Sequence, residues 1–232
     1  MTAAVVTVGT VARLSVREVS RRRMVVVLAV AQPLCFYLAR HDLTGQSVRM
    51  LTLGIAWAVS TLTAFVVIGA RRVDPRLRLT GAPAVSLAGG RLLAMSFAGV
   101  LLALGYWGLV AVDQDVRRLP AVGPMMLVTA LVAAPFGSLV AALLPRELEV
   151  ALALLTVAAV QMLADPAGML AKLLPFWSAR EIGTYAVDPV GVDYLQRGLL
   201  HAAVTWTACT AGTLAILAWR LRVARYPEPP PR

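Results

Sequence analysis

The chain has 232 residues, of which 59% are hydrophobic and 15% are charged, with a mean hydropathy of +0.76 and a formal net charge of +10. A soluble domain of this length carries about a quarter charged residues and under half apolar ones. The composition therefore excludes an ordinary soluble fold and indicates an integral membrane protein. The basic excess lies between apolar segments and belongs to no nucleic-acid-binding motif, so we expect contact with lipid phosphates and no nucleic-acid partner.

Residues 1–23 predict an amphipathic helix at the cytoplasmic membrane surface. Apolar side chains recur at every third position: Val5, Val8, Val11 and Leu14. Arginines recur at every fourth position: Arg13, Arg17 and Arg21. On a helix these rows fall on different faces, and such a helix lies in the headgroup layer with its arginines toward anionic lipid. A disordered basic leader is the alternative.

Six apolar segments predict an all-α membrane domain over residues 24–219, with transmembrane helices at about 24–39, 50–70, 92–112, 122–144, 150–163 and 199–219. The first is short and contains Pro33, so we expect it to be extended before Met24 or kinked at the proline, because a hydrocarbon core requires about 20 residues. The second carries small residues at a spacing of four: Ala56, Ser60 and Ala64. This spacing indicates a close packing face, within the chain or between chains.

Residues 164–197 are broken by glycines and prolines before the last apolar segment. They predict short re-entrant or extracytoplasmic helices, because irregular backbone at membrane depth must be buried in protein. An ordinary extracytoplasmic loop is the alternative. Residues 220–232 contain the run PEPPP and predict a disordered cytoplasmic tail.

Residues 71–91 form the most basic connection between two apolar segments, with a single acid, Asp74, and five arginines: Arg71, Arg72, Arg76, Arg78 and Arg91. Positive charge near a span resists translocation, so this loop is expected in the cytoplasm. With six spans and both termini inside, 15 of the 22 basic residues and 5 of the 12 acidic ones lie on the cytoplasmic side. This asymmetry predicts a multi-pass membrane protein with both termini in the cytoplasm. The arginine-, alanine- and valine-rich usage with a single lysine indicates a bacterial source, so we expect a bacterial cytoplasmic membrane.

The motifs of self-powered transport and of catalysis are absent from the sequence. The single lysine, Lys172, lies in an apolar stretch, so there is no G-x-x-x-x-G-K-[ST] loop for ATP, and two histidines without H-E-x-x-H give no zinc site. Ser138 and His201 resemble a rhomboid protease superficially, but the second glycine of G-x-S-G is missing and the topology separates the two residues. We therefore expect neither an enzyme nor a chain that binds its own cofactor.

The basic loop also has an apolar pattern, in which Arg78-Leu79-Thr80-Gly81-Ala82-Pro83-Ala84-Val85-Ser86 precedes Gly90-Arg91-Leu92-Leu93. This run resembles the R-L-x-x-T-P-x-S … G-K-L-L pattern of the permease subunits of type-2 ABC exporters. The resemblance covers nearly the whole chain: an amphipathic N-terminal helix, six spans and a broken segment before the last. Two features depart from it: Arg71-Arg72 replaces an acid, and Arg91 replaces a lysine.

The resemblance implies that residues 71–91 form a coupling helix on a separate ABC ATPase, which binds ATP and Mg²⁺. The implied docking residues are Arg72, Arg76, Arg78, Leu79, Pro83, Val85 and Leu87. A second permease copy or a homologous permease would complete a path for a hydrophobic or amphiphilic drug, antibiotic or lipid-like compound, as in multidrug efflux and antibiotic resistance. The implied path positions are Ser60, Thr63, Thr156 and Gln161. A non-transporting membrane scaffold or assembly factor is the alternative, and an intramembrane enzyme is a weaker one.

Overall fold

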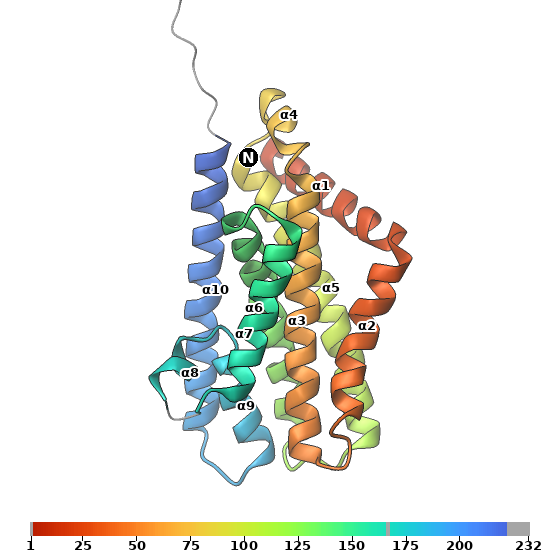
Figure 1. Ribbon diagram of the computed structural model, residues 1–232, viewed down its shortest axis with the longest axis vertical. Helices are drawn as coiled ribbons and strands as arrows, with labels where there is room; N and C mark the ends of the chain where they lie inside the picture. Colours follow the sequence, from red (N-terminus) through yellow and green to blue (C-terminus); the bar gives the residue numbers. More distant parts are fainter. Residues whose placement is uncertain (1, 166–167, 222–232) are drawn as a thin grey trace, which may run out of the picture.

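The computed structural model describes residues 2–165 and 168–221, and these residues form ten α-helices and no strand. The helices are α1 (Thr2–Arg21), α2 (Arg23–Leu38), α3 (Thr44–Ala70), α4 (Asp74–Leu79), α5 (Ala84–Asp113), α6 (Leu119–Leu143), α7 (Glu147–Leu163), α8 (Met169–Leu173), α9 (Trp177–Val187) and α10 (Asp193–Arg220). The long helices run side by side along one axis, and the chain turns back alternately at its two ends (Figure 1). The predicted all-α class is confirmed.

Within residues 2–165 and 168–221, four helices are long and apolar enough to cross a membrane: α3, α5, α6 and α10. Two further helices that were predicted as spans are shorter, since α2 has 16 residues and α7 has 17. At 1.5 Å per residue, each of these two covers about 25 Å. The structure is therefore compatible with a helical membrane protein, and the count of six spans remains a prediction.

Helices α3 and α6 form the centre of the bundle, and the apolar windows of both are 67% buried. The row of small residues faces this centre, because Ala56, Ser60 and Ala64 are each at most 1% exposed. The Ser60 hydroxyl donates a hydrogen bond to the Ala133 carbonyl of α6 at 3.1 Å, and Gly137 of α6 lies against the Ser60 backbone. The predicted packing face is confirmed, and it acts within the chain.

Helix α1 crosses the bundle at a steep angle to α2 and packs against α5 (Figure 1). The two helices are separated at Arg22, whose φ of −88° and ψ of 68° are not helical. The expected extension of the first span before Met24 is therefore wrong, and α2 continues through Pro33 instead. Gly54 of α3 lies beside Pro33 and leaves room for its ring.

The face of α1 that packs on α5 differs from the predicted apolar row. Val11 and Ser15 are buried, and Gly90 of α5 lies directly against Val11. Leu14 is 58% exposed, because a row at every third residue drifts around a helix that has 3.6 residues per turn. A helix is thus confirmed in this region, but its contact face is shifted.

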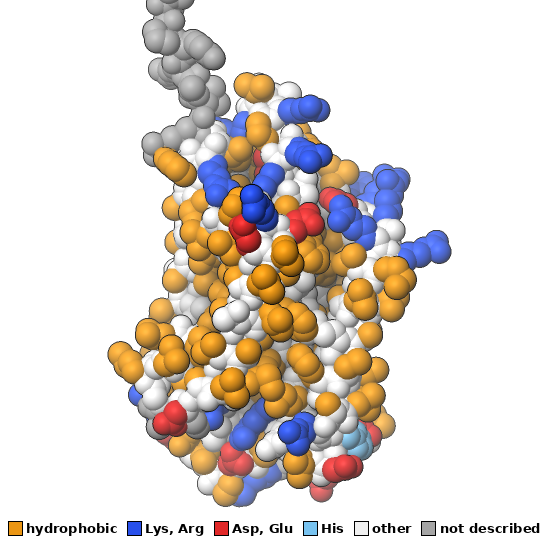
Figure 2. Space-filling view, viewed as in Figure 1, with side chains coloured by type: hydrophobic (Ala, Val, Ile, Leu, Met, Phe, Trp, Pro, Cys, Tyr) orange, Lys and Arg blue, Asp and Glu red, His pale blue; other side chains and the backbone are white. Residues whose placement is uncertain are grey.

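The two ends of the bundle differ in charge. One end, which we call the basic end, holds α1, α4, the turn between α6 and α7 and the C-terminal end of α10. The described residues at this end include 12 arginines and 4 acidic residues. The other, the neutral end, holds residues 39–49, 113–118, 164–165 and 168–197, which include 7 basic and 7 acidic residues. Figure 2 shows Lys and Arg gathered at the upper end, a hydrophobic belt below them and mixed charges at the bottom. The predicted tail lies outside the described residues from Arg222 onward.

Candidate functional site

Residues 71–91 do not form one loop, because a short helix and the start of a long one lie within them. Helix α4 begins at Asp74 with Pro75 in its first turn, a position where the missing N–H of proline costs nothing. It ends at Leu79, and after Thr80 the backbone of Gly81 adopts a φ of +93°, which glycine tolerates best. Helix α5 begins soon after, at Ala84. The apparent loop thus ends seven residues before Arg91.

A buried ion pair fixes α4 to α5. The Arg91 guanidinium donates from Nη1 to Asp74 Oδ2 at 2.8 Å and from Nη2 to Asp74 Oδ1. The two side chains are only 6% and 4% exposed. Two parallel charge-assisted hydrogen bonds give this contact a defined orientation as well as strength. Arg91 is therefore part of the support of α4 and does not project toward solvent, which corrects its assignment to the loop.

A second arginine ties the start of the same segment to α6. Arg71 donates hydrogen bonds to the carbonyl of Pro145 at 2.5 Å, to that of Leu144 at 2.6 Å and to that of Ala141. These carbonyls lie at the C-terminal end of α6, and the carbonyls at the end of a helix have no intrahelical donors. Burial lowers the pKa of Arg71, and the charge of Arg220 adds to this effect. The segment that carries α4 is thus held at both sides.

Five of the seven predicted docking residues are exposed and share the basic end: Arg72, Arg76, Leu79, Pro83 and Val85. We call these five residues the docking face. Leu79 is 78% exposed and Val85 is 59% exposed, so both present apolar area at this end of the bundle. Val73, 49% exposed, extends this apolar area and was missed by the sequence pattern because it lies among arginines.

The other two predicted docking residues are held within the chain. Leu87 is 1% exposed, because it lies in the first turns of α5 and faces the bundle, so its assignment to a partner contact is wrong. Arg78 is half-buried and donates to the Ala82 carbonyl at 3.0 Å and to the Leu221 carbonyl at 3.4 Å. It supports the turn after α4 and holds that turn against the C-terminal end of α10.

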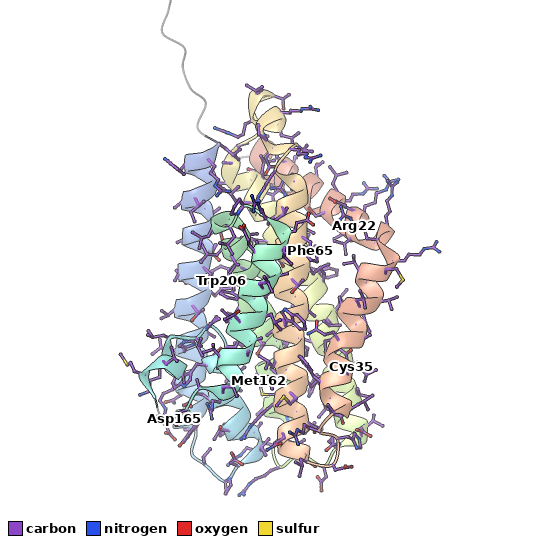
Figure 3. All side chains as sticks on the ribbon, viewed as in Figure 1. Arg22, Cys35, Phe65, Met162, Asp165 and Trp206 are labelled. Carbon is purple, nitrogen blue, oxygen red and sulfur yellow. The ribbon has the colours of Figure 1, made fainter. Side chains whose placement is uncertain are left out.

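The predicted arginines of α1 lie on its exposed side, at the same end of the bundle: Arg13, Arg17 and Arg21. Arg22, at the break after α1, pairs with Glu18 at 2.9 Å and lies above Phe65 of α3 in the view of Figure 3. The exposed row is suited to lipid phosphates, and that contact remains a prediction.

The predicted path residues are not brought together. Ser60 and Thr63 are buried, and Thr63 donates to its own helix at the Val59 carbonyl, 2.8 Å away. Thr156 is exposed and bonds the Leu152 carbonyl in the same way. Among the four, only Gln161 borders a hollow, while its Oε1 accepts a hydrogen bond from the Phe176 N–H at 3.3 Å. These residues form no common path within one chain.

The irregular region before α10 is a fixed structure at the neutral end. Arg118 donates to the carbonyls of Tyr185 at 2.5 Å, Asp188 at 3.0 Å and Val190 at 3.1 Å, and its guanidinium lies 4.4 Å from the centre of the Tyr185 ring. Arg49 pairs with Asp188 at 2.7 Å. Helix α9 also packs against α6 and α10. Short helices are thus confirmed here, and their depth in a membrane remains a prediction.

Glu181 on α9 predicts a pH-dependent stability. Its side chain is 10% exposed, and burial raises its pKa above the ordinary value, an effect that Arg197 at 3.5 Å and Arg180 only partly offset. When the pKa of an acid is higher in the folded chain than in the unfolded chain, protonation of that acid stabilises the folded state. The stability is therefore greatest below the unfolded pKa and falls as the pH rises through the folded pKa. Replacing Glu181 by glutamine should therefore raise the melting temperature at pH 7 relative to the native chain, with a smaller gain near pH 4. Thermal unfolding in detergent measures this, and the same change at exposed Glu147 should show no such trend.

The described geometry thus combines a firmly held docking face at the basic end with a second ordered group of residues at the neutral end. No family model matches the chain, and no curated protein sequence matches it, so the function is inferred from this geometry and from the sequence pattern.

Proposed function

We propose that the chain is the permease subunit of an ATP-driven exporter of the type-2 ABC class. It spans a bacterial cytoplasmic membrane six times with both termini inside. A separate ATPase, which binds ATP and Mg²⁺, docks at the basic end. A second permease copy or a homologous permease completes the path for a hydrophobic or amphiphilic compound.

The observation that carries this proposal is the docking face on and beside α4, together with the way α4 is held. An element that transmits movement from a partner must offer that partner an exposed surface and must be attached firmly to the helices that move. Leu79 and Val85 supply exposed apolar area, and neighbouring arginines supply charge. The buried contact of Asp74 with Arg91 attaches α4 to α5, and Arg71 attaches the same segment to α6.

Space for a second permease is left on the outer helices. The apolar windows of α5 and α10 are only 28% and 17% buried, against 67% for α3 and α6. On α5, Leu93, Phe97 and Leu101 are each more than half exposed and follow one another at a spacing of four, so they form a single apolar stripe. Lipid and a second permease can share such surfaces, which supports a membrane assembly of more than one chain.

The proposal predicts that aspartates at Leu79, Pro83 and Val85 abolish binding of the ATPase. These side chains are exposed, so the fold should be retained, while three carboxylates remove apolar contact and cancel most of the positive charge of the segment. A tagged chain is purified from its native membrane, and the ATPase that carries a phosphate-binding loop is quantified by mass spectrometry. We expect the recovered ATPase to fall by about tenfold or more, since central interface residues each contribute about 2 kcal/mol.

A matched control carries aspartates at Leu43 and Val192, which are 50% and 54% exposed at the neutral end. This variant should recover as much ATPase as the native chain. An unchanged ATPase yield from the Leu79, Pro83 and Val85 variant would remove the docking proposal. Absence of any ATPase with the native chain would instead favour the membrane scaffold.

A further inference from the structure

A hollow of about 410 Å³ lies at the neutral end, between α3, α6, α7 and α9. Its apolar lining includes Met50, Leu53, Met162 and Phe176. In Figure 3, Met162 lies in the lower half of the bundle on α7, above Asp165. The volume falls in the range of about 300–1,000 Å³ that is typical of small-molecule sites. The hollow is therefore large enough for part of an amphiphilic molecule.

The same hollow is lined by three arginines, Arg40, Arg49 and Arg180. Its lining includes no acidic residue. The arginines come from three separate segments, since Arg40 follows α2, Arg49 lies in α3 and Arg180 lies in α9. Arg49 pairs with Asp188, which lies outside the lining, whereas Arg40 and Arg180 form no ion pair with a described residue. An apolar cavity with converging cations is suited to an anion that carries an apolar group.

The arginine donors are incompletely used by the described residues. Arg49 bonds Asp188 through Nη2, but its Nε is buried without a hydrogen-bond partner. Arg180 makes one long hydrogen bond, 3.5 Å from its Nη1 to the Ala164 carbonyl. Burial lowers the pKa of Arg180, and the nearby charge of Arg49 lowers it further, against smaller opposing effects of Glu181 and Asp165. An anion between Arg49 and Arg180 would relieve this repulsion and use the free donors.

We infer that this hollow binds a phosphate-bearing amphiphile, with the phosphate at Arg49 and Arg180 and the apolar portion against Met50, Leu53 and Phe176. Planar guanidinium groups recognise phosphate through paired hydrogen bonds. The lining arginines belong to the neutral end. Figure 2 shows the hydrophobic belt adjoining the mixed charges of that end, which resembles the boundary between acyl chains and headgroups. The phosphate can come from a phospholipid headgroup or from a free phosphate compound. The site is contained in one chain, so it does not rest on the proposed ATPase.

The test is native mass spectrometry of the purified full chain in detergent, titrated with phosphatidylglycerol and, separately, with inorganic phosphate. The decisive variant is Arg180→Gln, because this side chain makes only one long hydrogen bond. The matched control is Arg117→Gln, an exposed arginine at the same end that does not line the hollow. A second variant, Ala179→Leu, fills the hollow without changing its charge.

We expect one phosphatidylglycerol per chain to bind, with an affinity about tenfold lower in Arg180→Gln, as for the loss of a hydrogen bond between charged groups. Ala179→Leu should also weaken binding, and Arg117→Gln should not. Binding of inorganic phosphate alone, lost in Arg180→Gln, would support the same anion site with a free phosphate as its source. Equal lipid and phosphate binding by Arg180→Gln and Arg117→Gln would overturn the inference.

Discussion

Replacing Asp74 by asparagine is expected to destabilise the chain by about 3–5 kcal/mol, because Arg91 would remain as a buried charge without its partner. The Arg91 side chain is 6% exposed, and among the described residues its side-chain hydrogen bonds go to Asp74. Asparagine keeps the shape of the residue and one acceptor but removes the negative charge. Thermal unfolding in detergent, followed by tryptophan fluorescence, should show a clear fall in melting temperature.

The exposed pair of Asp193 with Arg197 provides the control, because it joins the same residue types at 3.1 Å with side chains that are 63% and 51% exposed. Exposed ion pairs contribute about 0–1 kcal/mol, so Asp193→Asn should scarcely change the melting temperature. A double variant with Asp74→Leu and Arg91→Met should recover much of the loss, since apolar side chains leave no charge to be buried. Equal melting temperatures of the Asp74→Asn and Asp193→Asn variants would show that the ion pair of Asp74 with Arg91 does not hold α4.

The same segment shows where prediction from sequence works and where it stops. The long apolar runs predicted α3, α5, α6 and α10, because membrane spans depend on composition over about 20 residues. The start of α5 was misplaced, since the predicted span began only after the arginine-rich stretch that ends at Arg91, whereas the helix begins at Ala84. Gly90 lies inside this helix, where the backbone and the Val11 side chain of α1 lie directly against it. A contact between residues as distant in the chain as Val11 and Gly90 has no local signal.

The hydrogen bonds that hold the candidate sites in place could not be predicted from the sequence either. Asp74 and Arg91 are 17 residues apart, and Arg118 lies 67 residues before the Tyr185 carbonyl that it binds. Neither spacing belongs to a helical repeat or to a known motif, so only the fold brings these groups together. The hydroxyls of Thr63 and Thr156 were candidates for a path, but each is satisfied by the carbonyl one turn earlier in its helix, as is common inside membranes. Exposure of Leu79 and Val85, in contrast, follows from the polar pattern around them.

A side chain at Gly137 is expected to force α6 away from α3, which are the two most buried helices of the bundle. A Cβ at this position would lie 2.7 Å from the Cα and the carbonyl carbon of Ser60. These are backbone atoms, so no change of rotamer relieves the contact, and one of the helices must move. Such overpacking costs about 1–3 kcal/mol for alanine, and valine should cost more. The shift would also lengthen the 3.1 Å hydrogen bond from Ser60 to the Ala133 carbonyl.

Gly105 and Gly108 of α5 separate this steric effect from the general preference of a helix for alanine over glycine. A Cβ at either position meets no atom within 4 Å, so alanine there should leave the melting temperature unchanged or raise it, because alanine is favoured by about 0.5–1 kcal/mol in a helix. Gly137→Ala should lower the melting temperature and Gly137→Val should lower it further, since the added methyl groups meet the same backbone. If all the alanine variants have the same melting temperature, the close crossing of α3 and α6 is not the contact that holds the bundle centre.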